Sequence, residues 1–112
     1  MTISFVQPDS AHATAGYTHG VTASGRLLFV SGQVALDSQR EIVGPGDVEA
    51  QTAQVFENLK NVVTAAGASL KDVIRLGVYL TDRQHLEQYR RGRARYFSDP
   101  FPTSSLVIVT GL

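Results

Sequence analysis

The stretch between Asp47 and Gly67 constrains the fold of this chain more than any other part of the sequence. Its apolar residues recur at intervals of three, four and seven, which places them on one stripe of a helix; they are Val48, Val55, Phe56, Leu59, Val62, Val63 and Ala66. Asp47 can accept amide protons of the first turn as an N-cap, and Gly67 can adopt the left-handed conformation that ends a helix. The sequence therefore predicts an amphipathic helix over residues 48–66.

Strand patterns lie on both sides of this helix. Residues 3–6 alternate weakly, and residues 20–23 and 27–31 flank a Ser-Gly pair, which predicts a hairpin. The second hairpin strand is apolar without alternation, so we expect it to be covered on both faces. Residues 73–80 alternate strictly and residues 105–109 are rich in β-branched side chains, so both are predicted strands.

A second helix is predicted from the cap residues Thr81 and Asp82 to about residue 97. Its buried stripe would consist of Leu86, Tyr89, the aliphatic stem of Arg93, Tyr96 and Phe97. The order of hairpin, helix, strand, helix and strand predicts an α+β fold in which two helices cover one face of a mixed sheet. The other face of the sheet would stay bare, and a bare apolar face predicts a partner subunit.

The composition excludes several classes of function. With 112 residues the chain has the size of a single domain, and its ten basic and ten acidic residues give no overall field that would attract nucleic acid or a membrane. The absence of cysteine excludes disulfides and thiolate chemistry. No apolar run approaches the ~20 residues of a membrane span, and no secretory signal begins the chain, so we expect a soluble cytoplasmic protein.

Neither a metal site nor a nucleic-acid site is indicated by the remaining charged and polar residues. His12, His19 and His85 are scattered without ligand spacing, so we expect no metal. The second helix carries the cluster Arg90, Arg91, Arg93 and Arg95, which spreads around the helix without interleaved stacking aromatics. A solvated helix face is the favoured interpretation, with subunit salt bridges or RNA binding as alternatives.

Several short motifs follow one another in a familiar order. They are Tyr17-Thr18-His19-Gly20, Phe29-Val30-Ser31-Gly32-Gln33, residues 47–52 and 65–70 around the predicted helix, Val78-Tyr79-Leu80-Thr81-Asp82, and Phe101-Pro102. No one motif is specific, but in this order they resemble the RidA family, also called YjgF or reactive intermediate deaminases. The resemblance covers residues 1–112 as a single RidA-like domain.

The resemblance implies a chorismate-mutase-like α+β fold and a homotrimer. In that assembly three sheets form a central barrel, and small-molecule clefts lie between neighbouring subunits. Active members, the 2-iminobutanoate/2-iminopropanoate deaminases, hydrolyse enamines or imines such as 2-aminoacrylate to a keto acid and ammonia without a cofactor. Some other members have been described as endoribonucleases or translation inhibitors.

The resemblance also implies roles for particular residues. Tyr17 and Ser31 become candidate catalytic residues and Gly32 a substrate-binding one, although a packing ring and a small-residue strand end are the structural alternatives. His19 lies two residues from Tyr17, so an extended segment would point both side chains to one side of the cleft. A surface histidine is the alternative for His19.

The chain departs from the family pattern at Ser104, where the family carries an arginine that binds the substrate. A serine hydroxyl can bond a neutral ligand but cannot neutralise a carboxylate. Three functions therefore stay open. The chain could hydrolyse an imine, it could be a diverged relative that binds or transforms another small metabolite, or it could act on RNA. Arg26 or Arg75 of a neighbouring subunit could reach the cleft and replace the lost charge. The family's final strand, with its acidic cleft residue, is expected beyond Leu112 and outside the sequence.

Overall fold

Helix α1 spans Val48–Ala65, at the position that the apolar stripe predicts. The side chain of Asp47 accepts a hydrogen bond from the backbone N–H of Ala50 at 3.0 Å, which satisfies one amide of the first turn. At the other end Gly67 has a φ of 82°, and its N–H donates to the carbonyl of Thr64. Both predicted ends of the helix are confirmed.

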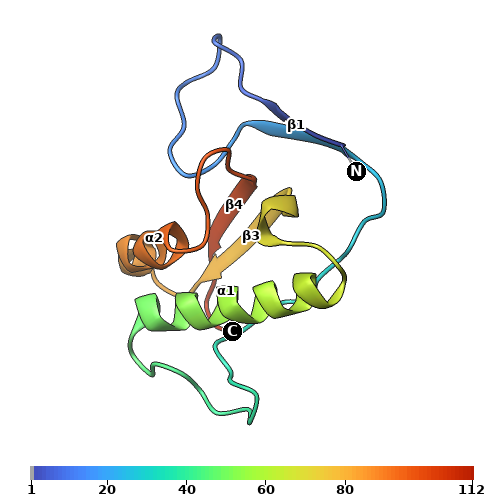
Figure 1. Ribbon diagram of the computed structural model, residues 1–112. Helices are drawn as coiled ribbons and strands as arrows, with labels where there is room; N and C mark the ends of the chain where they lie inside the picture. The colour runs from blue at the N-terminus through green and yellow to red at the C-terminus, as the bar shows by residue number, and fades with distance from the viewer. Residues whose placement is uncertain (1) are drawn as a thin grey trace.

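The computed structural model describes residues 2–112, and strands surround and separate its two helices. The remaining elements are β1 (Thr2–Val6), β2 (Gly20–Ser24), β3 (Arg75–Leu80), α2 (Leu86–Ala94) and β4 (Thr103–Ile108), with short 3₁₀ turns at Leu70–Asp72 and Arg83–His85. β1 pairs with β2 antiparallel and β3 with β4 parallel, so the strands form two small sheets. The predicted α+β fold is confirmed, and Figure 1 shows the two helices beside the β3–β4 pair.

The core lies between the two helices and the β3–β4 sheet. Its buried centre is formed by Phe56, Leu76, Tyr89 and Phe97. Phe56 of α1 is only 4% exposed, and its ring centre lies 5.1 Å from that of Phe97 and 6.2 Å from that of Tyr89. The buried stripe predicted for the second helix is thus confirmed at Tyr89 and Phe97, although α2 itself ends at Ala94.

The second face of the β3–β4 sheet carries exposed side chains. In β3 the predicted alternation is confirmed, because Leu76 is buried whereas the residues on either side of it are exposed. On the exposed face Tyr79 of β3 lies opposite Val107 of β4, and these side chains are 58% and 47% exposed. Adjacent large apolar side chains on one sheet face form a surface that a partner would bury.

The predicted hairpin of residues 20–31 is wrong. Its first strand exists as β2, but β2 pairs with β1, with Thr2 opposite Ser24. Gly25 has the positive φ that a tight turn needs, 118°, yet the chain does not fold back after it. β1 occupies one edge of β2, and the loop of residues 7–19 is long enough to bring the two together; within the described residues no strand pairs with the other edge.

Residues 27–31 form no strand, and the expectation that they are covered on both faces is also wrong. Phe29 is 87% exposed. The chain that follows this segment is held to α1, because the side-chain amide of Asn58 donates to the carbonyls of Val34 and Leu36. Sequence pattern alone could not reveal that tie, since it joins residues more than twenty positions apart.

Gly92 allows the two helices to approach closely. A Cβ atom on Gly92 would lie 2.7 Å from Cβ and Cγ2 of Thr52, whose hydroxyl is engaged with the carbonyl of Val48. We therefore expect Gly92→Ala to lower the free energy of unfolding by about 1–2 kcal/mol. Contacts as short as 2.7 Å place the cost of overpacking in the upper part of its usual range, about 2–3 kcal/mol. The roughly 1 kcal/mol by which alanine favours a helix over glycine offsets part of that cost.

Urea denaturation at one protein concentration measures this loss. Gly111→Ala is the control, because a Cβ there would meet no atom within 4 Å, and its effect should stay within about 0.5 kcal/mol. A Gly92→Ala variant as stable as the parent would contradict the close contact between α1 and α2.

Candidate functional site

A cavity of about 260 Å³ opens between α2, β4 and the loop that joins β1 to β2. Its polar lining consists of Tyr17, Tyr89, Arg90, Arg93 and Ser104. Leu86 and Leu106 contribute apolar surface. The volume suits a small metabolite rather than a drug-sized ligand or a polymer.

Tyr17 reaches the cavity because its loop is attached to the start of β4. The buried Thr18 donates its backbone N–H to the carbonyl of Pro102 at 3.2 Å. Two residues farther along, Ser104 pairs with Leu76 of β3 and so shares the side of the sheet that faces the helices. The structure thus brings together Tyr17 and Ser104, two of the site residues predicted from the sequence.

Two histidines surround Tyr17 on the loop side. Nε2 of His12 lies 3.3 Å from the Tyr17 hydroxyl. Nε2 of His19 lies 2.8 Å from the backbone carbonyl of His12, so this nitrogen carries the proton and donates. His19 is near Tyr17, with ring centres 6.2 Å apart, but it holds the loop and does not line the cavity. His12 is the neighbour that can exchange a proton with Tyr17.

The inner wall of the cavity is formed by Tyr89 and Arg93 of α2. Tyr89 is 4% exposed, and its hydroxyl has no hydrogen-bond partner among the described residues. The central carbon of the Arg93 guanidinium lies 5.6 Å from the centre of the Tyr89 ring. Burial raises the pKa of Tyr89, and the positive charge of Arg93 partly offsets that rise.

Gly16 makes room for the Arg93 side chain. It has a φ of 79°, and a Cβ atom at this position would collide with the Arg93 guanidinium. The residue before Tyr17 is therefore constrained twice, by a backbone conformation that favours glycine and by the cation packed against it. Loop and helix meet at this contact.

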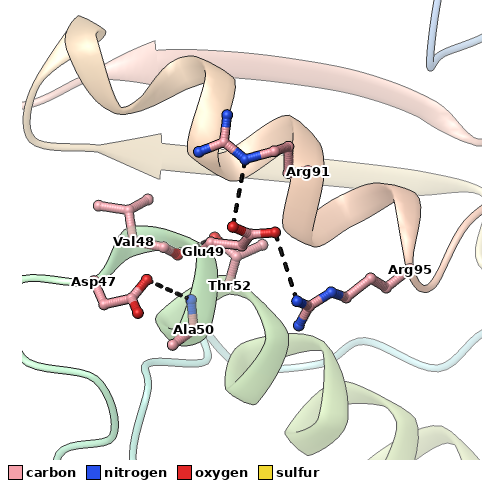
Figure 2. A network of polar contacts seen from close by, with 7 residues as sticks. All are labelled: Asp47, Val48, Glu49, Ala50, Thr52, Arg91 and Arg95. Carbon is pink, nitrogen blue, oxygen red and sulfur yellow. Dashed lines mark hydrogen bonds and ion pairs between the residues drawn. The ribbon is translucent and has the colours of Figure 1, made fainter.

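The other arginines of α2 are held by carboxylates. Figure 2 shows Arg91 and Arg95 reaching from α2 to Glu49 at the start of α1, with N···O distances of 3.3 and 3.6 Å. Arg90 pairs with Glu87 on α2 itself at 2.6 Å. The prediction of a solvated helix face is confirmed in that all three arginine side chains are exposed to solvent. It is incomplete, because Arg91 and Arg95 also bridge the two helices within one chain.

The other predicted site residues lie elsewhere. Gly32 lines a second, wider hollow of about 770 Å³ beside α1, together with Gln54 and Asn58. Ser31 is exposed and lines neither hollow. Within one protomer the structure therefore does not bring Ser31 and Gly32 together with Tyr17.

Arg93 lines the cavity but was not among the site residues predicted from the sequence, and the same holds for Tyr89 and Arg90. The helical pattern predicted only that the aliphatic stem of Arg93 would be buried. Neither Arg26 nor Arg75 lines the cavity of its own protomer, and their approach from a neighbouring subunit stays a prediction. Arg75 is exposed, and its guanidinium lies over Gly77 on the face of the sheet that points away from the helices. An arginine in the buried stripe of a helix was the available signal, because its charge must find a partner.

No Asp or Glu within residues 2–112 lines this cavity. In the same part of the chain no three histidine, aspartate or glutamate side chains gather closely enough to hold a metal ion. None of the helices there has the length and apolar character needed to cross a membrane. The polar chemistry of the cavity thus comes from hydroxyl groups and guanidinium groups.

The buried Tyr89 makes stability sensitive to alkaline pH. Since burial raises its pKa in the folded protein, the unfolded chain ionises first as the pH passes the usual value of about 10. The stability is fully present below that value and is lost as the pH rises through the folded pKa. We expect Tyr89→Phe to lose less stability than the parent between pH 9 and pH 11.5. The difference should be about 1.4 kcal/mol for each tenfold separation between the folded and unfolded ionisation constants of Tyr89.

Denaturant midpoints of the parent and the Tyr89→Phe variant across that pH range test this expectation. The comparison at pH 7 serves as the internal control, because both proteins are then un-ionised at this position. If the parent and the variant lose the same amount of stability as the pH rises, burial does not raise the pKa of Tyr89.

The sequence profile of the family described as Endoribonuclease L-PSP matches residues 8–112. A RutC family protein of Pyrococcus horikoshii is 38% identical over 96 residues, which cover 86% of this chain and 75% of the relative. Protein HMF1 of Saccharomyces cerevisiae is 32% identical over 100 residues, covering 89% of this chain and 76% of the relative.

Solved structures resemble the fold over almost all of its length. YyfB of Yersinia pestis, a protein of unknown function of the conserved Rid protein family, has a TM-score of 0.90 at 34% identity, covering 100% of this chain and 89% of that chain. RidA of the Antarctic bacterium Psychrobacter has a TM-score of 0.73 at 32% identity, with coverage of 97% and 88%. The elements that form the cavity, α2 and β4, thus lie within the shared fold.

Proposed function

Because the chain belongs to the Endoribonuclease L-PSP family, which includes the RidA proteins, we propose that it hydrolyses a small enamine or imine to a carbonyl compound and ammonia. The observation that carries this proposal is the cavity that joins Tyr17, Ser104 and an arginine at one small site. It offers a hydroxyl for the reacting nitrogen and a cation for a substrate carboxylate. Both are needed to bind and polarise the imine of a 2-oxo acid.

Tyr17 is the proposed catalytic residue. Its hydroxyl would give a proton to the imine nitrogen while water adds to the carbon and loses a proton to His12, and the resulting amino alcohol would release ammonia to leave the carbonyl product. Nε2 of His12, 3.3 Å from the hydroxyl, can return the proton to Tyr17. No acidic side chain of residues 2–112 lines the cavity, so a relay from His12 through Tyr17 is the proton path that the described residues support.

A coupled assay tests this function. A dehydratase acting on serine generates 2-aminoacrylate, and the disappearance of that compound is followed with and without the purified protein. We expect acceleration, and a clear loss of it in Tyr17→Phe. A folded protein that leaves the decay rate of 2-aminoacrylate unchanged would overturn the proposal.

A homotrimer is part of the proposal. It is supported by the exposed apolar pair Tyr79 and Val107 and by the exposed Phe29, which a neighbouring subunit could bury. Ser31 and Gly32 lie outside the cavity of their own protomer, so an interface is the arrangement in which they could share a cleft with Tyr17. Light scattering should give three times the chain mass of 12.1 kDa, and a monomeric mass would contradict the interface cleft.

The second candidate is a diverged relative that binds or transforms another small metabolite without releasing ammonia. Ser104 favours it, because the hydroxyl is a neutral group at the position of the family's arginine. An RNA-directed role has less support. Arg90, Arg91 and Arg95 of the arginine cluster are paired with Glu49 or Glu87, which leaves little free positive charge in that cluster for phosphates.

A further inference from the structure

Arg93 differs from its neighbours on α2 in having no acidic partner. Arg90, Arg91 and Arg95 each lie within 4.0 Å of a glutamate, whereas no aspartate or glutamate of the described chain comes so close to Arg93. Arg93 is also half-buried and faces the cavity. A partly desolvated cation without a counter-charge is costly, and a bound anion removes that cost.

Tyr89, against which the Arg93 guanidinium lies, supplies a second sign of a ligand. Its hydroxyl is buried without a protein partner among the described residues, and Tyr89 lines the same cavity as Arg93. The tyrosine ring is fixed in the core against Phe56, so the hydroxyl is held in place. A buried donor beside an uncompensated cation is complementary to a carboxylate, which can accept hydrogen bonds from both.

We propose that Arg93 and Tyr89 form a carboxylate-binding subsite, so that α2 provides the cation that Ser104 of β4 cannot. The planar guanidinium can hold a carboxylate through two parallel hydrogen bonds, and Gly16 leaves the space in which it lies. The Ser104 hydroxyl, on the facing wall, adds a neutral hydrogen-bonding group. The ligand class is a short 2-oxo acid or its imine, and this assignment of class rests on the proposed function.

Arg90 does not fill this role, although it also lines the cavity. Its guanidinium is already paired with Glu87 at 2.6 Å, and its side chain is half exposed to solvent. An exposed ion pair of this kind contributes little to binding a further anion. The inner position and the free charge both belong to Arg93.

Equilibrium binding of pyruvate, the stable product expected from 2-aminoacrylate, tests the subsite without any catalytic step. Calorimetric titrations at fixed ionic strength would compare the parent chain with Arg93→Gln and with the control Arg91→Gln, an arginine that does not line the cavity. We expect Arg93→Gln to weaken pyruvate binding roughly thirty-fold or more, and Arg91→Gln to change it less than about two-fold. Pyruvamide, which lacks the charge, should bind weakly to all three proteins.

Two further variants keep the result interpretable. Arg93→Lys retains the positive charge but loses the planar group that donates two parallel hydrogen bonds. Its affinity for pyruvate should therefore fall between those of the parent and Arg93→Gln. Tyr89→Phe preserves the ring in the core and should weaken pyruvate binding several-fold through loss of one hydrogen bond. Equal binding of pyruvate by the parent and a folded Arg93→Gln variant, or equal affinity of the parent for pyruvate and pyruvamide, would overturn the subsite.

The two proposals can fail separately. Arg93-dependent binding of pyruvate by a protein that does not hydrolyse 2-aminoacrylate would support the subsite and overturn the deaminase function. Hydrolysis that is equally fast in Arg93→Gln would support the deaminase function and overturn the subsite.

Discussion

Replacing Phe56 with alanine should lower the free energy of unfolding by about 3–5 kcal/mol. The side chain is 4% exposed and sits at the middle of the core, with its ring 5.1 to 6.2 Å from those of Phe97, Tyr96 and Tyr89. Alanine would remove the burial of a whole ring and leave a cavity that three other aromatic residues cannot easily collapse to fill. The loss is a large part of the roughly 5–15 kcal/mol that typically stabilises a domain.

Chemical denaturation of the two proteins at equal concentration measures this difference. Val62→Ala, on the more exposed side of the same helix, is the matched control and should change stability by less than about 1 kcal/mol. A Phe56→Ala variant within about 1 kcal/mol of the parent would mean that Phe56 is not at the centre of the core.

The same substitution connects the core to the cavity. Tyr89 packs its ring against Phe56 in the core and also lines the cavity. Loss of the Phe56 ring would free Tyr89 to move away from its position beside Arg93. Phe56→Ala should therefore weaken ligand binding as well, although Phe56 does not line the cavity.

The elements with local signals were predictable from the sequence. The carboxylate of Asp47 and the positive φ of Gly67 bound α1 as expected, because capping depends on neighbouring residues alone. The alternation of β3 predicted correctly that Leu76 is buried and Tyr79 exposed. The hairpin prediction was wrong because β2 pairs with β1 and residues 27–31 form no strand, and local pattern alone does not reveal which segments pair.

The site was predictable only where a motif marked it. Tyr17 and Ser104 were identified by resemblance, but their proximity depends on the bond between Thr18 and Pro102, which joins distant parts of the chain. Arg93 was assigned to the buried stripe because helical periodicity shows which face of a helix carries the aliphatic part of a side chain. It does not show where the guanidinium group at the end of that side chain lies. The sequence did not distinguish Arg93 from Arg26 and Arg75 as the source of positive charge at the site, and tertiary structure was required to show that, of the three, Arg93 lines the cavity of its own protomer.

Moving the charge across the cavity should restore what Arg93→Gln removes. Arg93 of α2 and Ser104 of β4 line the same cavity of about 260 Å³ from different elements. In the double variant Arg93→Gln/Ser104→Arg, the new guanidinium enters that space from β4, at the position where the RidA family carries its arginine. We expect pyruvate affinity at least about tenfold above that of Arg93→Gln alone, since a desolvated charge pair is regained.

Calorimetry on the parent, both single variants and the double variant forms a cycle that isolates this coupling. In Ser104→Arg alone two cations share the cavity, and their repulsion should make that variant less stable than the double variant by about 1 kcal/mol. A double variant that binds pyruvate no better than Arg93→Gln would show that the two positions do not serve one carboxylate. Recovery would instead mean that the fold fixes where the anion lies, while either wall can supply its positive charge.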